Sequence, residues 1–175
     1  AVGAGSYHNS GFTGAINFTA YNDFEILSVW VDADGAGART ITLWDGYVLN
    51  GGGAPTNTVL ESKTINLVDG SQRVLLNIAV PGPGDYSLGG SNVDLFRNNT
   101  GVSYPYTVPD VLSMNSSSAS VPADYYYYFY DWNIRLDSCA GALSTVTAEI
   151  VDASFASVVS GGTAAFTDNS TGATS

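Results

Sequence analysis

The chain has 175 residues, with 5 Lys or Arg against 16 Asp or Glu, which gives a net charge of −11. A chain this acidic argues against binding to nucleic acid and to anionic membrane surfaces, because both need basic side chains. Charged residues make up only 12% of the chain, about half of what is usual in soluble domains. Ser, Thr, Asn and Gly must therefore build much of the surface, which favours an extracellular protein.

The single cysteine, Cys139, excludes an internal disulfide and a cysteine-based metal site. No run of apolar residues approaches the roughly 18 that a membrane-spanning helix needs, so we predict no membrane insertion. The chain begins at Ala1 rather than at Met, and we expect a mature or trimmed product.

Short runs of β-branched and aromatic residues, bounded by Gly, Pro, Asn or Asp, predict strands rather than helices. In chain order the predicted strands are Ala15–Thr19, Glu25–Ala33, Thr40–Trp44, Val59–Leu67, Arg73–Val80, Asp85–Leu88, Val93–Arg97, Val111–Asn115 and Tyr125–Leu136. This spacing predicts an all-β fold, an antiparallel two-sheet sandwich of jelly-roll type. Trp30, in the middle of a strand, is expected in the core.

Two turns carry recognisable chemistry. The stretch "DADGAGAR" at Asp32–Arg39 offers glycines for positive φ between two strands. The stretch "VDGSQ" at Val68–Gln72 contains Asp-Gly, which predicts a hairpin.

The composition changes after Leu136, and we divide the chain into a sandwich domain (1–137), a linker (138–152) and a C-terminal segment (153–175). In this segment "ASF", "GGT" and "FTDNSTG" resemble the opening of a PKD domain, an Ig-like sandwich common in secreted bacterial enzymes and adhesins. The resemblance implies the first strands of an incomplete PKD-like domain. Exposed edge strands of this kind would invite strand pairing with another chain.

The sandwich domain carries a resemblance of its own. The stretches "VWVDADGAGARTITLWD", "LFRNNTGVSYPYTVPDVLSM" and "YYYYFYDWNI" are similar to a β-sandwich module of large surface proteins of Bacteroidetes. Those proteins often end in a sorting domain for type IX secretion. The resemblance implies a secreted or cell-surface location within a modular protein.

An aromatic row, Tyr125 to Tyr130 followed by Trp132, raises the question of function. In one continuous strand, alternate residues face opposite sides. The even positions continue into Ile134 and Leu136, so we expect that face in the core. The odd positions continue into polar side chains, so we expect the following residues to face outward: Tyr125, Tyr127, Phe129, Asp131, Asn133 and Arg135.

Outward rings beside a carboxylate suit a sugar, because a pyranose ring offers C–H groups to stack and hydroxyls to hydrogen-bond. A strand buried on both faces is the alternative reading of the row. We add to the predicted glycan site the loop residues Arg97, Asn98, Asn99, Tyr104 and Tyr106. The alternative for Arg97 is an ion pair with Asp131 that only fixes the loop.

Trp44 completes the predicted site, because its parity is opposite to that of Ile41 and Leu43. A ring buried at the sandwich edge is the alternative.

Catalytic and metal-binding patterns are sparse. His8 is the only histidine, so the sequence offers no arguable Ser-His-Asp triad. The carboxylate pairs Asp23/Glu25 and Asp32/Asp34 have a spacing that a glycosidase could use, but both lie at turn borders. Asp32 and Asp34 are candidate ligands of a structural calcium ion.

The sequence therefore predicts a non-catalytic module that binds a polysaccharide or surface glycan. A structural or adhesive spacer that makes protein–protein contacts is the alternative, and a glycoside hydrolase is a third.

Overall fold

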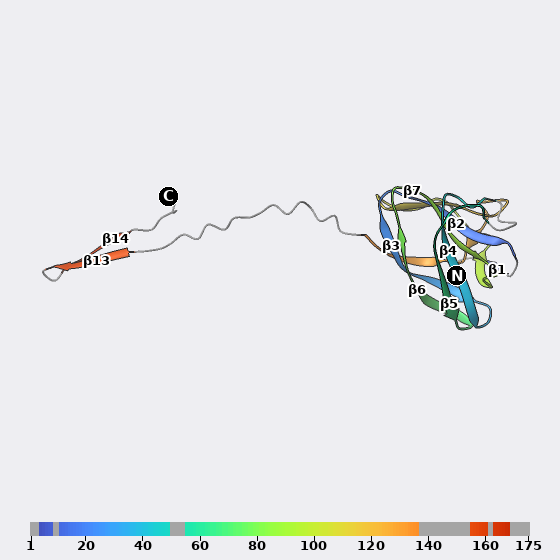
Figure 1. Ribbon diagram of the computed structural model, residues 1–175, viewed down its shortest axis with the longest axis horizontal. Coiled ribbons are helices and arrows are strands. Elements are labelled where there is room, and N and C mark those ends of the chain that lie inside the picture. The colour runs from blue at the N-terminus through green and yellow to red at the C-terminus, as the bar shows by residue number, and fades with distance from the viewer. Residues whose placement is uncertain (1–3, 9–10, 50–54, 137–154, 161–162, 169–175) are drawn as a thin grey trace. The chain divides into compact units, whose positions relative to one another are not determined.

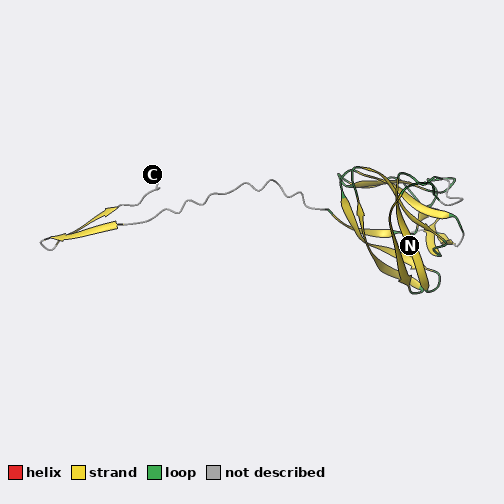
Figure 2. Ribbon diagram, viewed as in Figure 1, coloured by secondary structure: helices red, strands yellow, loops and turns green. Residues whose placement is uncertain are grey.

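The computed structural model describes residues 4–8, 11–49, 55–136, 155–160 and 163–168. All regular elements among these residues are strands (Figure 2), which confirms the all-β prediction. None of the described residues belongs to a helix long and apolar enough to span a membrane. The chain divides into two compact units, residues 1–138 and 139–175.

Two antiparallel sheets build the first unit (Figure 1). The first sheet contains β1 (Gly5–His8), β3 (Phe24–Ala33), β6 (Gly70–Val80), β8 (Leu95–Asn98), β11 (Tyr126–Tyr127) and β12 (Tyr130–Arg135). The second sheet has the order β5 (Val59–Leu67), β4 (Gly37–Asp45), β7 (Gly84–Ser91), β2 (Thr13–Ala20), β10 (Leu112–Ser117) and β9 (Tyr106–Val108). The predicted two-sheet sandwich is confirmed.

Alternation along the strands fills the space between the sheets. In β6 the buried side chains Val74, Leu76, Ile78 and Val80 alternate with exposed neighbours. Facing side chains from the second sheet, including Phe18 of β2, join the same core. Burying each such side chain contributes about 1.5–3 kcal/mol, so this alternation is the main determinant of the fold.

Trp30 lies on the other face of its strand. It is 37% exposed, whereas its neighbours Val29 and Val31 are fully buried. The prediction that Trp30 belongs to the core is wrong, because the alternation of β3 directs Val29 and Val31 inward and Trp30 outward.

The predicted strands all correspond to observed ones, and two further strands, β1 and β9, had no clear pattern in the sequence. Both are short, and neither contains a fully buried residue. The turn between β3 and β4 has Gly35 and Gly37 at positive φ, as expected.

The predicted hairpin at Asp69-Gly70 is wrong. β5 pairs with β4 in the second sheet, and β6 pairs with β3 in the first. Gly70, at φ 88°, instead begins the strand that follows the crossing from one sheet to the other. The Asp69-Gly70 turn therefore connects two strands that belong to different sheets.

The aromatic row is two strands rather than one. β11 runs antiparallel to β8, and β12 runs antiparallel to β3. Because β3 and β8 are themselves antiparallel, β11 and β12 run in opposite directions. The chain reverses at Tyr128, which has φ 67°, and the N–H of Phe129 donates to the carbonyl of Tyr127 at 2.9 Å. Such a three-residue turn is rare and strained.

In the second unit β13 (Phe155–Ser160) pairs antiparallel with β14 (Thr163–Asp168). The resemblance of this segment to a PKD domain stays a prediction. The predicted linker, residues 138–152, lies outside the described residues.

Candidate functional site

The reversal at Tyr128 changes which rings are buried. Tyr127, Tyr128 and Phe129 are 1%, 0% and 0% exposed. The prediction that Tyr127 and Phe129 face outward is therefore wrong. The alternation of a continuous strand does not continue through a turn, so the two halves of the row have independent faces.

Beyond the turn, the predicted alternation holds for most positions. Asp131, Asn133 and Arg135 are exposed, whereas Trp132 and Ile134 pack against the core. Leu136 was expected in the core but is exposed, because β12 ends at Arg135.

One backbone carbonyl fixes two of the rings. The carbonyl of Phe129 accepts the hydroxyl proton of Tyr126 at 2.8 Å and the Nε1–H of Trp132 at 2.9 Å. The ring of Tyr126 stacks on that of Tyr130, with centroids 5.2 Å apart and planes at 28°. The Tyr130 hydroxyl in turn donates to Oδ1 of Asn98 at 2.8 Å. The turn thus places three rings in a fixed arrangement.

These rings border a pocket of about 460 Å³, within the range of small-ligand sites. Its lining residues are Asn98, Gly101, Val102, Tyr106, Met114, Tyr126, Tyr130, Asp131 and Trp132. They come from β8, β11 and β12 of the first sheet, from β9 and β10 of the second, and from the loop between β8 and β9. The pocket therefore lies where the two sheets meet.

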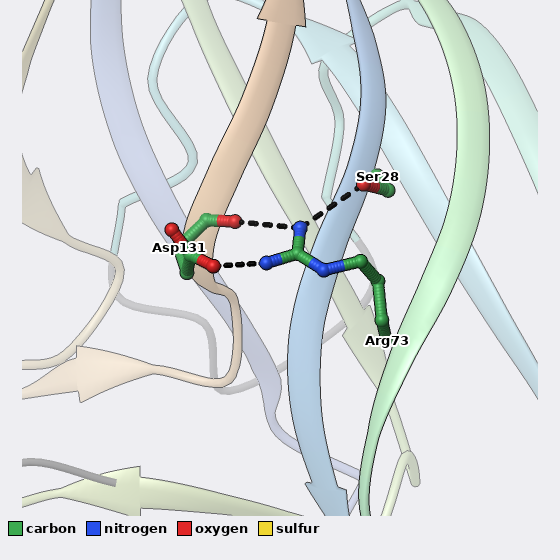
Figure 3. A network of polar contacts seen from close by, with 3 residues as sticks. All are labelled: Ser28, Arg73 and Asp131. Carbon is green, nitrogen blue, oxygen red and sulfur yellow. Dashed lines mark hydrogen bonds and ion pairs between the residues drawn. The ribbon is translucent and has the colours of Figure 1, made fainter.

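A carboxylate marks the rim of the pocket. Asp131 is exposed and forms an ion pair with Arg73 of β6. Arg73 also donates from Nη1 to the Asp131 carbonyl and to Oγ of Ser28, each at 3.1 Å (Figure 3). The same guanidinium lies 5.7 Å from the ring centroid of Trp30. These contacts hold Asp131 in one orientation beside the pocket.

The loop between β8 and β9 and the first residue of β9 add further rings. Tyr104 stacks on Tyr126 at 6.1 Å and donates its hydroxyl proton to the carbonyl of Tyr125 at 3.0 Å. Tyr106 packs edge-on against Tyr104 and Tyr126 and is 38% exposed. Tyr106 thus lines the pocket, whereas Tyr104 supports it through Tyr126.

Arg97 belongs to a different cluster. Its Nη1 donates to the hydroxyl of Tyr127 at 2.9 Å, and its guanidinium lies 4.7 Å from the ring centroid of Tyr125. The alternative interpretation, in which Arg97 pairs with Asp131, is wrong because Asp131 pairs with Arg73. Attraction between a guanidinium and ring faces holds this cluster together.

Two further predicted site residues lie elsewhere. Trp44 is 6% exposed and packs with Ala15 and Val48, so its outward placement is wrong and the buried alternative holds. Asn99 is exposed, and its backbone N–H donates to the carbonyl of Ala4 at 3.1 Å.

Burial sets the protonation of the pocket tyrosines. It raises the pKa of the Tyr104, Tyr126 and Tyr130 hydroxyls well above the usual 10. Neighbouring tyrosines raise the pKa of Tyr104 and Tyr126 further. These hydroxyls therefore stay neutral donors at physiological pH.

One carboxylate of each predicted pair is engaged within the protein. Oδ1 and Oδ2 of Asp32 accept the hydroxyl protons of Tyr7 at 3.0 Å and Ser71 at 2.9 Å. Glu25 forms an ion pair with Arg135. Among the described residues no cluster of three or more His, Cys, Asp or Glu could hold a metal ion. Calcium binding at Asp32 and Asp34 stays a prediction.

Of the predicted site residues, the structure brings Asn98, Tyr106 and Asp131 to the pocket. The other six lining residues were not predicted for the site from the sequence: Gly101, Val102, Met114, Tyr126, Tyr130 and Trp132. No sequence pattern marked the decisive turn, since Tyr128 stands where Gly or Asn would be usual.

Comparisons with protein-family models, with curated proteins and with solved structures found no match for this chain.

Proposed function

We propose that the first unit, residues 1–138, is a non-catalytic glycan-binding module of a secreted or cell-surface multidomain bacterial protein. The observation that carries this proposal is the pocket at the junction of the sheets. Four aromatic side chains, Tyr106, Tyr126, Tyr130 and Trp132, contribute to its walls, and the carboxylate of Asp131 stands at its rim.

The residue types suit a pyranose. Ring faces stack on the C–H groups of a sugar, and an exposed carboxylate accepts hydrogen bonds from its hydroxyls. The arrangement is held before any ligand arrives, because Phe129, Asn98 and Arg73 fix the side chains around the pocket. Preorganisation of this kind lowers the entropic cost of binding.

Charge narrows the ligand class. The net charge of −11 repels strongly anionic chains and slows their encounter with the protein. We therefore expect a neutral or weakly acidic polysaccharide.

A single site of this size should bind with a dissociation constant of about 10–1000 μM, since few groups are paired and ordered water is displaced. Repeated modules would raise the avidity.

A glycan array combined with pull-downs on insoluble polysaccharides tests the proposal. Tyr106→Ala should weaken binding at least about tenfold, because the exposed ring lies on the pocket wall. Tyr21→Ala is the matched control, since Tyr21 is similarly exposed at 47% and is not among the pocket residues. If the folded protein binds nothing in either assay, or if both variants bind like the parent, the glycan proposal fails.

A second candidate, the structural or adhesive spacer, is favoured by a different surface. Val59 and Leu60 of β5 and Leu75 of β6 are exposed, on strands at the ends of their sheets. Edge strands with apolar side chains favour contacts with other protein chains. Concentration-dependent association, measured by sedimentation and abolished by Leu75→Lys, would support it. A monomer at all concentrations, without a protein partner, would count against it.

A further inference from the structure

Three hydrogen-bond donors of the pocket wall are used inside the protein. The hydroxyl of Tyr126 and the indole N–H of Trp132 both donate to the carbonyl of Phe129. The hydroxyl of Tyr130 donates to Asn98. Three of the four aromatic residues of the wall therefore offer the surface of their ring to a ligand and no free hydrogen-bond donor.

The rest of the wall between the sheets is also apolar. Met114 of β10 is 8% exposed, and its sulfur lies 3.5 Å from the Tyr126 hydroxyl. Val102, in the loop before β9, lines the same pocket. The exposed polar side chains of the lining are Asp131, at the rim, and Tyr106, whose hydroxyl accepts the N–H of Ser103 at 2.9 Å. The pocket thus combines an apolar wall with a polar rim.

The apolar wall disfavours a sugar hydroxyl and favours a methyl group. A ligand hydroxyl placed against Met114 and Val102 would give up hydrogen bonds to water without replacement, which is unfavourable. A methyl group in the same place would gain contact with the side chains and lose nothing. A sugar with hydroxyls on every side leaves at least one of them against the apolar wall.

We propose that the pocket selects pyranoses that carry a methyl group, as an N-acetyl substituent or as the methyl of a 6-deoxy sugar. The methyl group lies against Met114 and Trp132, and the ring hydroxyls face the rim at Asp131. This inference rests on the glycan-binding proposal and deepens it. One methyl group more or less in an apolar pocket changes affinity by roughly tenfold or more, which sets the expected preference.

The Arg73–Asp131 ion pair adds a second selection. The guanidinium of Arg73 is already bound to the carboxylate of Asp131 and to Ser28. At the rim, Asp131 therefore offers an acceptor oxygen, whereas the positive charge of Arg73 is already paired. A uronic acid would place its carboxylate beside that of Asp131, so we expect acidic sugars to bind more weakly than their neutral counterparts.

The chain offers a single-atom probe of the pocket. Met114 is the only methionine, so the full 175-residue protein labelled with ¹³C in the methionine methyl gives one such resonance, located at the pocket. The indole N–H of Trp44, observed through ¹⁵N-labelled tryptophan in the same protein, is the control, because Trp44 is buried in a separate cluster with Ala15 and Val48.

The test titrates the labelled protein with matched pairs of methyl glycosides. One pair is N-acetylglucosamine and glucose, and the other is a 6-deoxyhexose and its parent hexose. We expect the methyl-bearing member of at least one pair to bind about tenfold more tightly and to shift the Met114 resonance but not that of Trp44. Comparing the pairs shows which source of the methyl group is preferred.

A variant separates selectivity from folding. Val102→Thr keeps the side-chain shape and replaces one methyl group of the apolar wall by a hydroxyl, so it should reduce the preference at least about threefold, by stabilising the unsubstituted sugar. Val121→Thr, at an exposed site that does not line the pocket, should leave the preference unchanged.

Different outcomes of this titration would overturn the methyl selectivity and the glycan-binding proposal. Sugars that bind with equal affinity within each pair, or that leave Met114 unshifted, overturn the methyl selectivity but not glycan binding. If no sugar binds and N-acetylphenylalanine amide shifts the Met114 resonance, the pocket receives a peptide side chain, and both proposals are overturned.

Discussion

Tyr128 is the residue on which the arrangement of the aromatic row depends. Its φ of 67° is a conformation that glycine adopts more readily. The ring compensates for this strain, because it is fully buried and its hydroxyl lies 2.9 Å from Nδ1 of His8. A buried ring thus stabilises a turn that the local backbone does not favour.

Gly14 leaves room for the Tyr128 ring. A Cβ at position 14 would lie 2.2 Å from the Tyr128 hydroxyl oxygen and 2.6 Å from ring carbons. We expect Gly14→Ala to lower the free energy of unfolding by about 1–3 kcal/mol, as overpacking usually does. Urea unfolding measures the loss. Gly11→Ala is the control, since a Cβ there meets nothing within 4 Å, and equal stability of both variants would contradict the packing described.

Phe129→Ala gives a second prediction. Because the ring is fully buried, its removal should cost about 3–5 kcal/mol. Trp132→Ala should cost less, since Trp132 is only partly buried at the pocket. Denaturant midpoints compare the two variants. A Phe129→Ala protein that unfolds at the parent's midpoint would contradict the burial of the Phe129 ring and support the outward orientation that the sequence predicted.

The sequence was least informative about which individual side chains of the aromatic row face the core. Alternation assigns a face only while the chain remains one strand, and no Gly, Pro or Asn announces the reversal at Tyr128. Beyond the turn the same rule placed Asp131 and Asn133 correctly. The error therefore comes from an unrecognised turn and not from the principle of alternation.

Among the elements, β1 shows how a short, polar strand is held. It pairs with β8, and its last residue, His8, packs edge-on against Phe12 and Tyr127. Burial lowers the pKa of His8, and the positive charge of Arg97 lowers it further, while Asp94 raises it. The folded state therefore favours the neutral imidazole.

This shift predicts a pH dependence. The stabilising contribution of neutral His8 is fully present above its ordinary pKa of 6.5. It is lost as the pH falls below 6.5 toward the lower pKa of the folded state, because the unfolded chain binds a proton first. We expect the free energy of unfolding to decrease between about pH 7 and pH 5, a range above the usual pKa of carboxylates.

Denaturation at a series of pH values measures this effect, with His8→Gln as the variant that cannot titrate. The variant should show a flatter profile over the same range. Stability that increases as the pH falls, or identical slopes for parent and variant, would contradict a half-buried, neutral His8.

Elements were easier to predict than their partners. Alternating apolar residues located β3 and β5 to within one residue, and they located the end of β6, which begins three residues before the predicted strand. Their assignment to sheets was not accessible, since Asp69-Gly70 looks the same in a hairpin and in a crossing between sheets. Strand position depends on local pattern, whereas pairing depends on contacts distant in sequence.

At the scale of the whole molecule, the sandwich and the C-terminal segment are separate compact units. We expect residues 1–138 to fold alone, because the described core of the sandwich consists of their own side chains. Circular dichroism should show a strand-rich spectrum and one cooperative transition for that fragment. A fragment without a cooperative transition would show that the sandwich needs the remainder of the chain.

The fold class was accessible from sequence because many positions contribute to it. The pocket was not, because it depends on one turn and on the meeting of β9 and β10 with β11 and β12. Asn98, Tyr106 and Asp131 were found through their chemistry, whereas Tyr126, Tyr130 and Met114 reach the pocket only through the tertiary structure.

The most direct test is a crystal structure of the protein with the tightest-binding glycan. We predict sugar density in the pocket between Tyr106, Tyr130 and Trp132, with a hydroxyl within hydrogen-bonding distance of Asp131. Density on another surface, such as the outer face around Trp30 and Leu75, with the pocket unchanged, would contradict it.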